Sequence, residues 1–192
     1  MNPAVKQLNS IMPPIPLPPV VAPPWIDIEH AMGVRLPTDY REFIDSYGDG
    51  QMNRSLSVFF PARRGPHRTS MAALSDRTAG LYASGFFDKF GIGDAEFARA
   101  KGKSAALLLW GQSKLGDLLF WSTDSEDADR WTVTVFLQET LEHRRWSHYD
   151  QGMAEFLVAV AERTIPESAR LLGPAAGRAR WSRLRDWGQY YG

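Results

Sequence analysis

The chain has 192 residues, of which 44% are hydrophobic, and Lys plus Arg equals Asp plus Glu at 22 each. This composition predicts one globular domain with a substantial core, and the balanced charge gives no global attraction to nucleic acid or to a membrane surface. Cysteine is absent, which excludes disulfides and thiolate chemistry, and without an apolar run of membrane-spanning length or a signal-peptide pattern we expect a cytoplasmic protein.

Residues 1–24 are rich in proline, with eight of the thirteen prolines of the chain. Proline removes backbone donors and favours polyproline II, so this segment is predicted to be an extended arm outside the domain. The arm is either a ligand for an aromatic groove of another protein or a segment that packs on its own domain. Packing is favoured by its apolar residues, namely Ile15, Leu17, Val20 and Val21.

Residues 25–48 predict two short helices joined by a sharp elbow. The first carries Trp25, Ile28 and Met32 on one face and ends at Gly33, which suits a left-handed cap. A proline then stops the chain from continuing as a helix, and the second helix begins at a capping threonine and ends at a glycine. Its predicted elements are Leu36 and Pro37 at the elbow, Thr38 as the cap, Tyr40, Phe43, Ile44 and Tyr47 as the buried face, and Gly48 at the end.

The middle of the chain predicts a mainly antiparallel sheet. Residues 55–60 read as a half-buried strand, and residues 69–82 and 94–100 as helices. Three apolar or alternating runs follow at 105–110, 117–122 and 131–137, with connections short enough for antiparallel pairing, and a further strand is expected around 144–146. A last core helix is predicted to begin at Asp150 and to end at Pro166. The fold class is therefore α+β, a single domain spanning 25–165.

Residues 166–192 form a basic, aromatic C-terminal extension. Trp181, Leu184 and Trp187 are spaced by three residues, which favours an amphipathic helix. Such a helix either binds a partner or docks on its own sheet, and arginine stems with tryptophan rings favour docking.

Catalytic or metal chemistry has few candidates in this sequence. His143, His148 and Asp150 are the one cluster with acid–base or metal-binding potential. A separation of five positions between the histidines suits neither a helix nor a strand as a shared metal site, so a non-catalytic role is favoured. The acids at 123–129 lack the central glycine and terminal glutamate of a calcium loop, and we expect no cofactor and no metal. The basic loop at 63–68 is either a contact for phosphate or an acidic partner or a solvated loop, and its short length favours the solvated loop.

The elbow resembles the opening signature of the SUKH superfamily, which includes fungal Smi/Knr cell-wall regulators and many bacterial immunity proteins. The resemblance is carried by Met32-Gly33, Leu36-Pro37, Tyr40, Phe43-Ile44 and Tyr47-Gly48, and continues through Trp110-Gly111, Gly116-Asp117, Trp121 and the helix start at Met153. It implies an α+β fold and a non-catalytic immunity protein that neutralises a toxin of a polymorphic or contact-dependent system. The alternative it implies is a regulatory or scaffold module. The residues expected to be structural are Trp25, Leu36, Pro37, Tyr40, Gly48, Trp110 and Gly116.

Local charge suggests how such a protein would bind its partner. Residues 25–50 hold six acids and two arginines, and residues 117–129 hold five acids and no base. If these stretches share a face, their field attracts a basic protein, such as a nuclease toxin whose substrate groove would then be covered. The predicted contacts are Asp117, Trp121, Asp124, Glu126, Asp127 and Asp129, with Asp39, Glu42 and Asp45 as a secondary set.

Overall fold

The computed structural model describes residues 1–15, 23–48, 50–61, 80, 107–138, 145–173 and 177–183. Its helices are α1 (Pro3–Ile11), α2 (Trp25–Met32), α3 (Thr38–Tyr47), the 3₁₀ helix η2 (Ala128–Arg130), α6 (Met153–Glu162) and α7 (Ser168–Leu172). Its strands are β1 (Gly50–Met52), β2 (Leu56–Val58), β3 (Leu107–Ser113), β4 (Leu118–Ser122), β5 (Thr132–Phe136), β6 (Trp146–Tyr149) and β7 (Trp181–Arg183).

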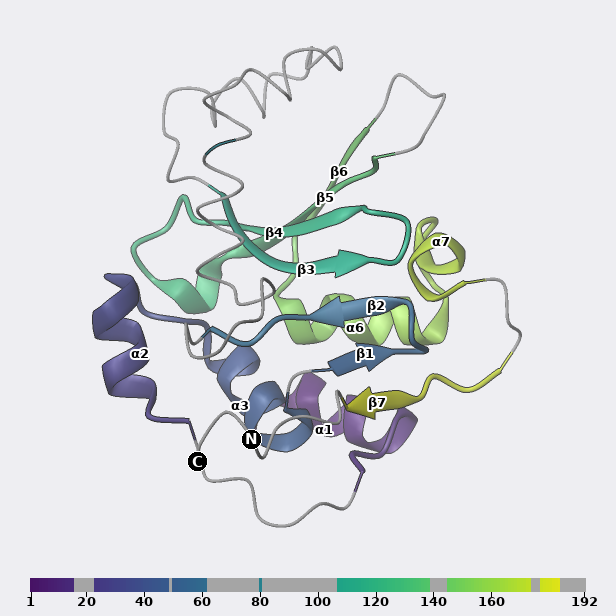
Figure 1. Ribbon diagram of the computed structural model, residues 1–192, viewed down its shortest axis with the longest axis horizontal. Helices are drawn as coiled ribbons and strands as arrows, with labels where there is room; N and C mark the ends of the chain where they lie inside the picture. The colour runs from purple at the N-terminus through teal and green to yellow at the C-terminus, as the bar shows by residue number, and fades with distance from the viewer. Residues whose placement is uncertain are drawn as a thin grey trace.

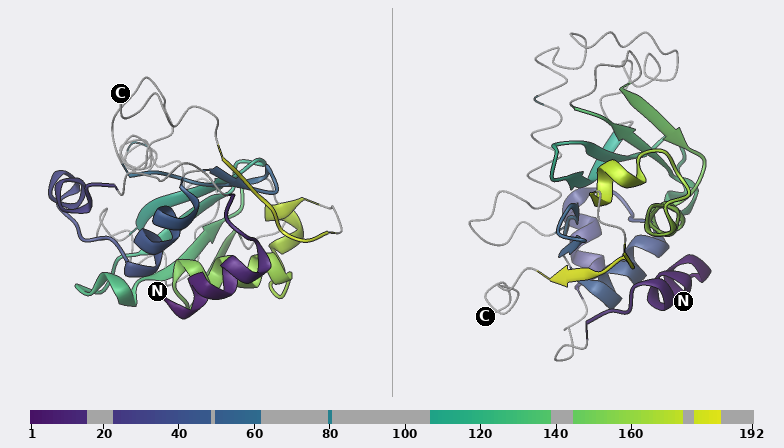
Figure 2. Two further views of the ribbon diagram at one scale, coloured as in Figure 1. Left: turned by 90° about the horizontal axis from the view of Figure 1, so that it is seen from below. Right: turned by 90° about the vertical axis from the view of Figure 1, so that its right-hand side faces the viewer.

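The described strands form one seven-stranded sheet in the order β6-β5-β4-β3-β2-β1-β7 (Figure 1). Every neighbouring pair is antiparallel. Helices α1, α3 and α6 pack against one another and lie together on one side of this sheet (Figure 2). The predicted class, a single α+β domain with a mainly antiparallel sheet, is confirmed.

The elbow at 25–48 forms as predicted, with one difference at the second helix. Helix α2 ends at Gly33, whose φ of 67° is the left-handed conformation of a helix cap. Helix α3 is followed by Gly48, also at positive φ. The threonine at the start of α3 makes no side-chain cap of its own, because its backbone N–H and its hydroxyl both donate to Asp129.

The residues expected to be structural occupy core or turn positions. Leu36, Tyr40 and Trp110 are buried, and Pro37 is buried beside them. Trp25 is half-buried and meets the Tyr40 ring edge-on, with 6.2 Å between the ring centroids. Gly116 lies in the β3–β4 turn at φ 88°, where a Cβ would also collide with the Gln138 side-chain oxygen.

The prediction of an extended arm over residues 1–24 is wrong for its first half. Residues Pro3–Ile11 form α1, which begins where Asn2 accepts a hydrogen bond from the Ala4 N–H, and a proline at the first helical position suits such a start. Val5, Leu8 and Met12 are fully buried against the rest of the core. Ile15 is exposed, and residues 16–22, with the remaining apolar candidates, lie outside the described part.

The predicted boundary at residue 165 also fails, because the segment after it belongs to the sheet. Helix α7 packs on α6, and Trp181, which was expected in a helix, lies in β7 and pairs with β1. Leu184 and Trp187 fall outside the described residues, as do the predicted helices at 69–82 (apart from Gly80) and 94–100 and the basic loop at 63–68. Across the described ranges, no helix combines the length and apolar character required to cross a bilayer.

Candidate functional site

The loop between β4 and β5 presents four of the eight predicted acids on a fixed backbone; we call residues 124–130 the acidic loop. The Asp129 N–H donates to the Asp127 carboxylate at 3.1 Å, and the Trp131 indole N–H donates to the Ser125 carbonyl at 2.8 Å. Trp131 is buried beneath the loop, which anchors it to the core. All four acids of this loop are exposed residues, namely Asp124, Glu126, Asp127 and Asp129.

Asp129 joins the acidic loop to the elbow. One carboxylate oxygen accepts the Thr38 backbone N–H at 2.5 Å, and the other accepts the Thr38 hydroxyl at 2.9 Å. A carboxylate at this position satisfies a free N–H of the first turn of α3 and interacts favourably with the positive end of the helix. The two acidic stretches of the sequence therefore meet at the start of α3.

Asp39 likewise accepts a free N–H at the start of a helix, in this case α6. Its carboxylate accepts the Ala154 N–H at 2.8 Å, in the first turn of α6, where the N-cap residue is Gly152 and offers no side chain. Burial raises the pKa of Asp39 against the lowering effect of hydrogen bonds from Ala154 and Tyr40, and the charges of Asp129 and Glu155 raise this pKa further. Asp39 is buried and structural, so its predicted contact with a partner is wrong.

Replacing Asp39 tests this capping role and its pH dependence. Because the pKa of Asp39 is raised on folding, the folded chain holds this proton to higher pH than the unfolded chain, and the unfolding free energy falls as pH rises through that window above 3.8. Asp39→Asn keeps an acceptor for the Ala154 N–H but cannot titrate. The unfolding free energy of this variant minus that of the wild type should therefore grow as the pH is raised from about 4. Asp39→Ala should cost about 0.5–2 kcal/mol through the lost cap. Urea denaturation at a series of pH values measures both effects.

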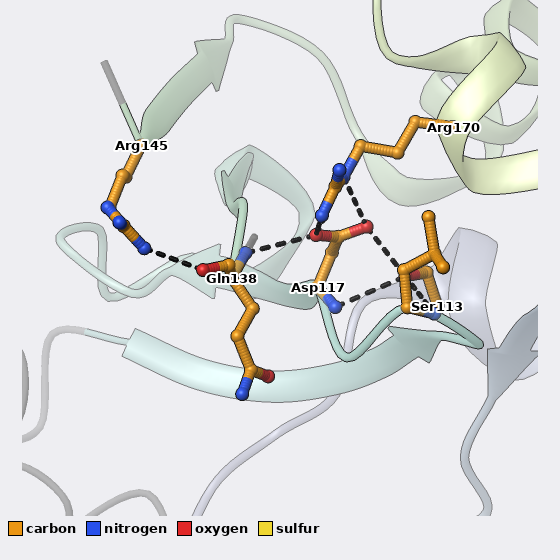
Figure 3. A network of polar contacts seen from close by, with 6 residues as sticks. Ser113, Asp117, Gln138, Arg145 and Arg170 are labelled. Carbon is orange, nitrogen blue, oxygen red and sulfur yellow. Dashed lines mark hydrogen bonds and ion pairs between the residues drawn. The ribbon is translucent and has the colours of Figure 1, made fainter. Parts of the chain in front are cut away.

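Asp117 is not a surface acid but the centre of a buried polar network (Figure 3). Arg170 of α7 pairs with it through contacts of 2.6 Å and 2.9 Å. The Ser113 hydroxyl and the Gln138 backbone N–H also donate to the same carboxylate, at 2.6 Å and 3.0 Å. This network ties the β3–β4 turn, the end of β5 and α7 together, and the prediction that Asp117 contacts a partner is wrong.

Trp121 is also fully buried, on the side of the sheet that faces the helices. Its ring meets Tyr40 edge-on at 5.1 Å between centroids and lies 6.0 Å from both Trp110 and Trp131. A partner therefore has no access to it, and the predicted contact is wrong. The sequence offered a signal, since Trp121 closes a continuous apolar run that begins at Leu118, and such a run is typical of a strand buried on both faces.

The two remaining acids of the secondary set contact the N-terminal part of the chain. Asp45 accepts the Trp25 indole N–H at 3.1 Å. Glu42 accepts the backbone N–H of Asn2 and lies 3.5 Å from the Met1 amino group. These contacts hold α1 and α2 against α3, so both acids have a structural role. The contacts give no reason to place Glu42 and Asp45 in the same surface as the acidic loop.

Two of the three candidates for catalysis, His148 and Asp150, lie in the described part of the chain. His148 is exposed on β6, and its Nδ1 lies 3.2 Å from the Thr134 hydroxyl, which is 2.9 Å from the Ser122 hydroxyl. These three side chains form a polar row across β4, β5 and β6. Asp150 is exposed beyond the strand, and His143 lies outside the described residues. Within the described ranges no three His, Cys, Asp or Glu side chains are grouped to hold a metal ion.

Two charged residues of this region were missed by the sequence reasoning. Glu155 is exposed in the first turn of α6 and is close enough to act on Asp39, so it adds an acid beside the start of α3. Arg170, the counter-ion of Asp117, is 53 residues away in sequence. No local spacing pattern joins residues so far apart.

No family model matches the sequence, and no curated protein or solved structure matches it significantly.

Proposed function

We propose that the chain is a non-catalytic immunity protein that binds and neutralises a cognate toxin of a bacterial polymorphic or contact-dependent system, in the cytoplasm. The resemblance of the elbow to the SUKH superfamily motivates this proposal, and the α+β architecture agrees with the fold that the resemblance implies. A locally basic toxin such as a nuclease fits best, because the acidic loop groups four exposed acids.

The acidic loop is the observation that carries the proposal. Asp124 and Glu126 are exposed, and no cation of the described chain pairs with either. Arg130 is the one base in the loop, so its net charge stays negative. The loop is held by its own hydrogen bonds and by Thr38, so little conformational freedom would be lost on binding. A fixed negative field also speeds encounter with a basic partner and disfavours other partners.

The proposed interface is smaller than the set predicted from sequence. It consists of Asp124, Glu126 and Asp127, with Asp129 at its edge and Glu155 added from α6. Asp127 and Asp129 also stabilise η2 and α3, so replacing them would change the fold and the interface together. Asp124 and Glu126 are therefore the residues whose replacement reports on binding alone.

Capture of the partner tests the proposal, followed by a neutralisation assay. A tagged copy of the chain is recovered from its own host at moderate salt, and the co-eluting proteins are identified. The proposal predicts one stoichiometric partner that carries a toxin domain. Expression of that domain alone should arrest growth, and co-expression of this chain should restore it. Several substoichiometric partners, or a partner whose activity the chain leaves unchanged, would contradict the proposal and favour a scaffold module.

A further inference from the structure

Strand β7 packs along the edge of β1, and we call the surface that it covers there the groove. It pairs with β1 in the register Gly50↔Arg183, Gln51↔Ser182 and Met52↔Trp181. The Trp181 ring is buried and meets two aromatic rings of α3 nearly edge-on, Phe43 at 5.3 Å and Tyr47 at 5.6 Å between centroids. The groove thus combines a strand edge, which offers backbone hydrogen bonds, with an aromatic pocket for one side chain.

The C-terminal ends of two helices provide further acceptors in this groove. The Tyr47 carbonyl at the end of α3 accepts the Trp181 indole N–H at 2.9 Å and the Arg183 Nε–H at 3.1 Å. The Ile11 carbonyl at the end of α1 accepts the Arg178 Nε–H at 2.6 Å, and the same guanidinium donates to the Ser10 carbonyl. Helix C-termini carry partial negative charge and favour cations, so both arginines lie where the groove attracts them.

Glycines at the base of the groove permit this close approach. A Cβ on Gly50 would lie 2.5 Å from the Ser182 carbonyl oxygen and 2.8 Å from the Trp181 ring. Gly50 has no positive φ, so an alanine there conflicts with the strand in the groove and not with its own backbone. Gly50→Ala is therefore a substitution that closes the groove selectively.

We propose that this groove, formed by the β1 edge, the Phe43 and Tyr47 rings and the C-terminal ends of α1 and α3, is a recognition site for an extended segment of a basic protein in which arginines flank a tryptophan. Residues 177–183 are its intramolecular occupant. A segment of the same chemistry binds in their place by adding a strand to the sheet, with the same backbone pairs, pocket and arginine acceptors. The backbone pairing of β7 with β1 is only three residue pairs long, and among the described strands β7 has no second neighbour, so this edge pairing is short enough for another strand to replace it.

This site is independent of the acidic loop, which lies at the start of α3 while the groove lies at its end. Success or failure of the immunity proposal therefore leaves it untouched.

Binding of a labelled peptide with the sequence of residues 177–183 tests the proposal on the full-length chain. Trp181→Ala removes the anchor of the internal strand, so the peptide should bind this variant saturably, as fluorescence anisotropy reports. The wild type should bind it at least tenfold more weakly, because its own β7 competes. The double variant Gly50→Ala/Trp181→Ala should not bind, and neither variant should bind a peptide with alanine in place of its tryptophan.

The opposite results would overturn the proposal. If the Trp181→Ala chain keeps the near-ultraviolet circular dichroism of a folded protein and binds no peptide, the groove is not a recognition site. If the Trp181→Ala and Gly50→Ala/Trp181→Ala chains bind the peptide with the same affinity, the peptide binds outside the groove. That result would also contradict the proposal.

A second form of the experiment covers the case in which Trp181→Ala does not fold. A protease site placed within residues 174–176 allows the folded full-length chain to be cleaved after purification. Excess unlabelled 177–183 peptide should then displace the C-terminal fragment, which gel filtration detects. Retention of the fragment at a hundredfold excess of peptide would show that β7 is not exchangeable, and the proposal would fail.

Discussion

Replacing Arg170 with methionine is expected to lower the free energy of unfolding by about 3–5 kcal/mol. The substitution leaves the fully buried Asp117 carboxylate with only neutral donors, from Ser113 and Gln138. An ionised group without a counter-ion in a buried position carries a desolvation penalty that these two hydrogen bonds do not offset. The loss is measurable as a shift of the urea or thermal unfolding midpoint at neutral pH.

A paired variant and a matched control separate this effect from the loss of an arginine as such. The double variant Asp117→Asn/Arg170→Met removes both charges and should recover much of the lost stability, because a neutral amide replaces the unpaired carboxylate. Arg130→Met removes an exposed arginine and should stay within about 0.5 kcal/mol of the wild type. If Arg170→Met were as stable as Arg130→Met, the ion pair would not hold α7 to the hairpin.

The second large effect is expected for Trp121→Ala, with a loss of about 3–5 kcal/mol. This ring fills the space between Tyr40, Trp110 and Trp131 beneath the sheet, and its removal leaves a cavity that the flanking rings cannot close. The loss should appear in unfolding experiments whether or not a partner is present.

Trp121→Phe is the matched control for the aromatic packing. It keeps a ring in the cavity and removes an indole N–H that has no hydrogen-bond partner among the described residues, so its loss should be clearly smaller. If the Trp121→Ala chain had wild-type stability and bound its partner more weakly, Trp121 would not be a buried core residue. It would then belong to the partner interface, as predicted from the sequence.

Local signals in the sequence were sufficient for the elbow and for the central strands of the sheet. A glycine after an apolar helical stripe, a Leu-Pro stop and a closing glycine each act within a few residues, and α2 and α3 begin and end where these signals lie. The strands β3, β4 and β5 follow from apolar runs with short connections, although β3 extends to Ser113, three residues beyond the predicted run at 105–110. A bulge beside Trp110 in β3 shifts the register there.

The acids were misassigned because their roles depend on partners far away in the chain. Asp117, Asp39 and Asp124 look alike in sequence, yet the first pairs with Arg170, the second caps α6 and the third is exposed. Their partners are set by tertiary packing, which no spacing pattern of a single sequence records. A cluster of acids in the sequence is thus a weak predictor of an interface, because acidic side chains also bind helix N-termini and pair with arginines inside the fold.

Both ends of the chain were assigned outside the domain because composition was given more weight than local structure. The prolines that suggested an arm over 1–24 lie mostly after Met12, and the capping Asn2-Pro3 pair before them starts α1. Strand β7 has only three residues, too few for a period-two pattern to show. Its place is set by Gly50 and by the rings of α3.

The most direct test of the immunity proposal compares two double charge reversals for binding to the captured toxin. Asp124→Lys/Glu126→Lys changes the acidic loop, whereas Asp27→Lys/Asp150→Lys makes the same change in net charge at two exposed acids, one on α2 and one after β6. The proposal predicts an affinity about 10–100-fold weaker for the first variant, with a reduced salt dependence, and an affinity near that of the wild type for the second. Equal affinity of both variants and the wild type would show that the acidic loop does not contact the toxin.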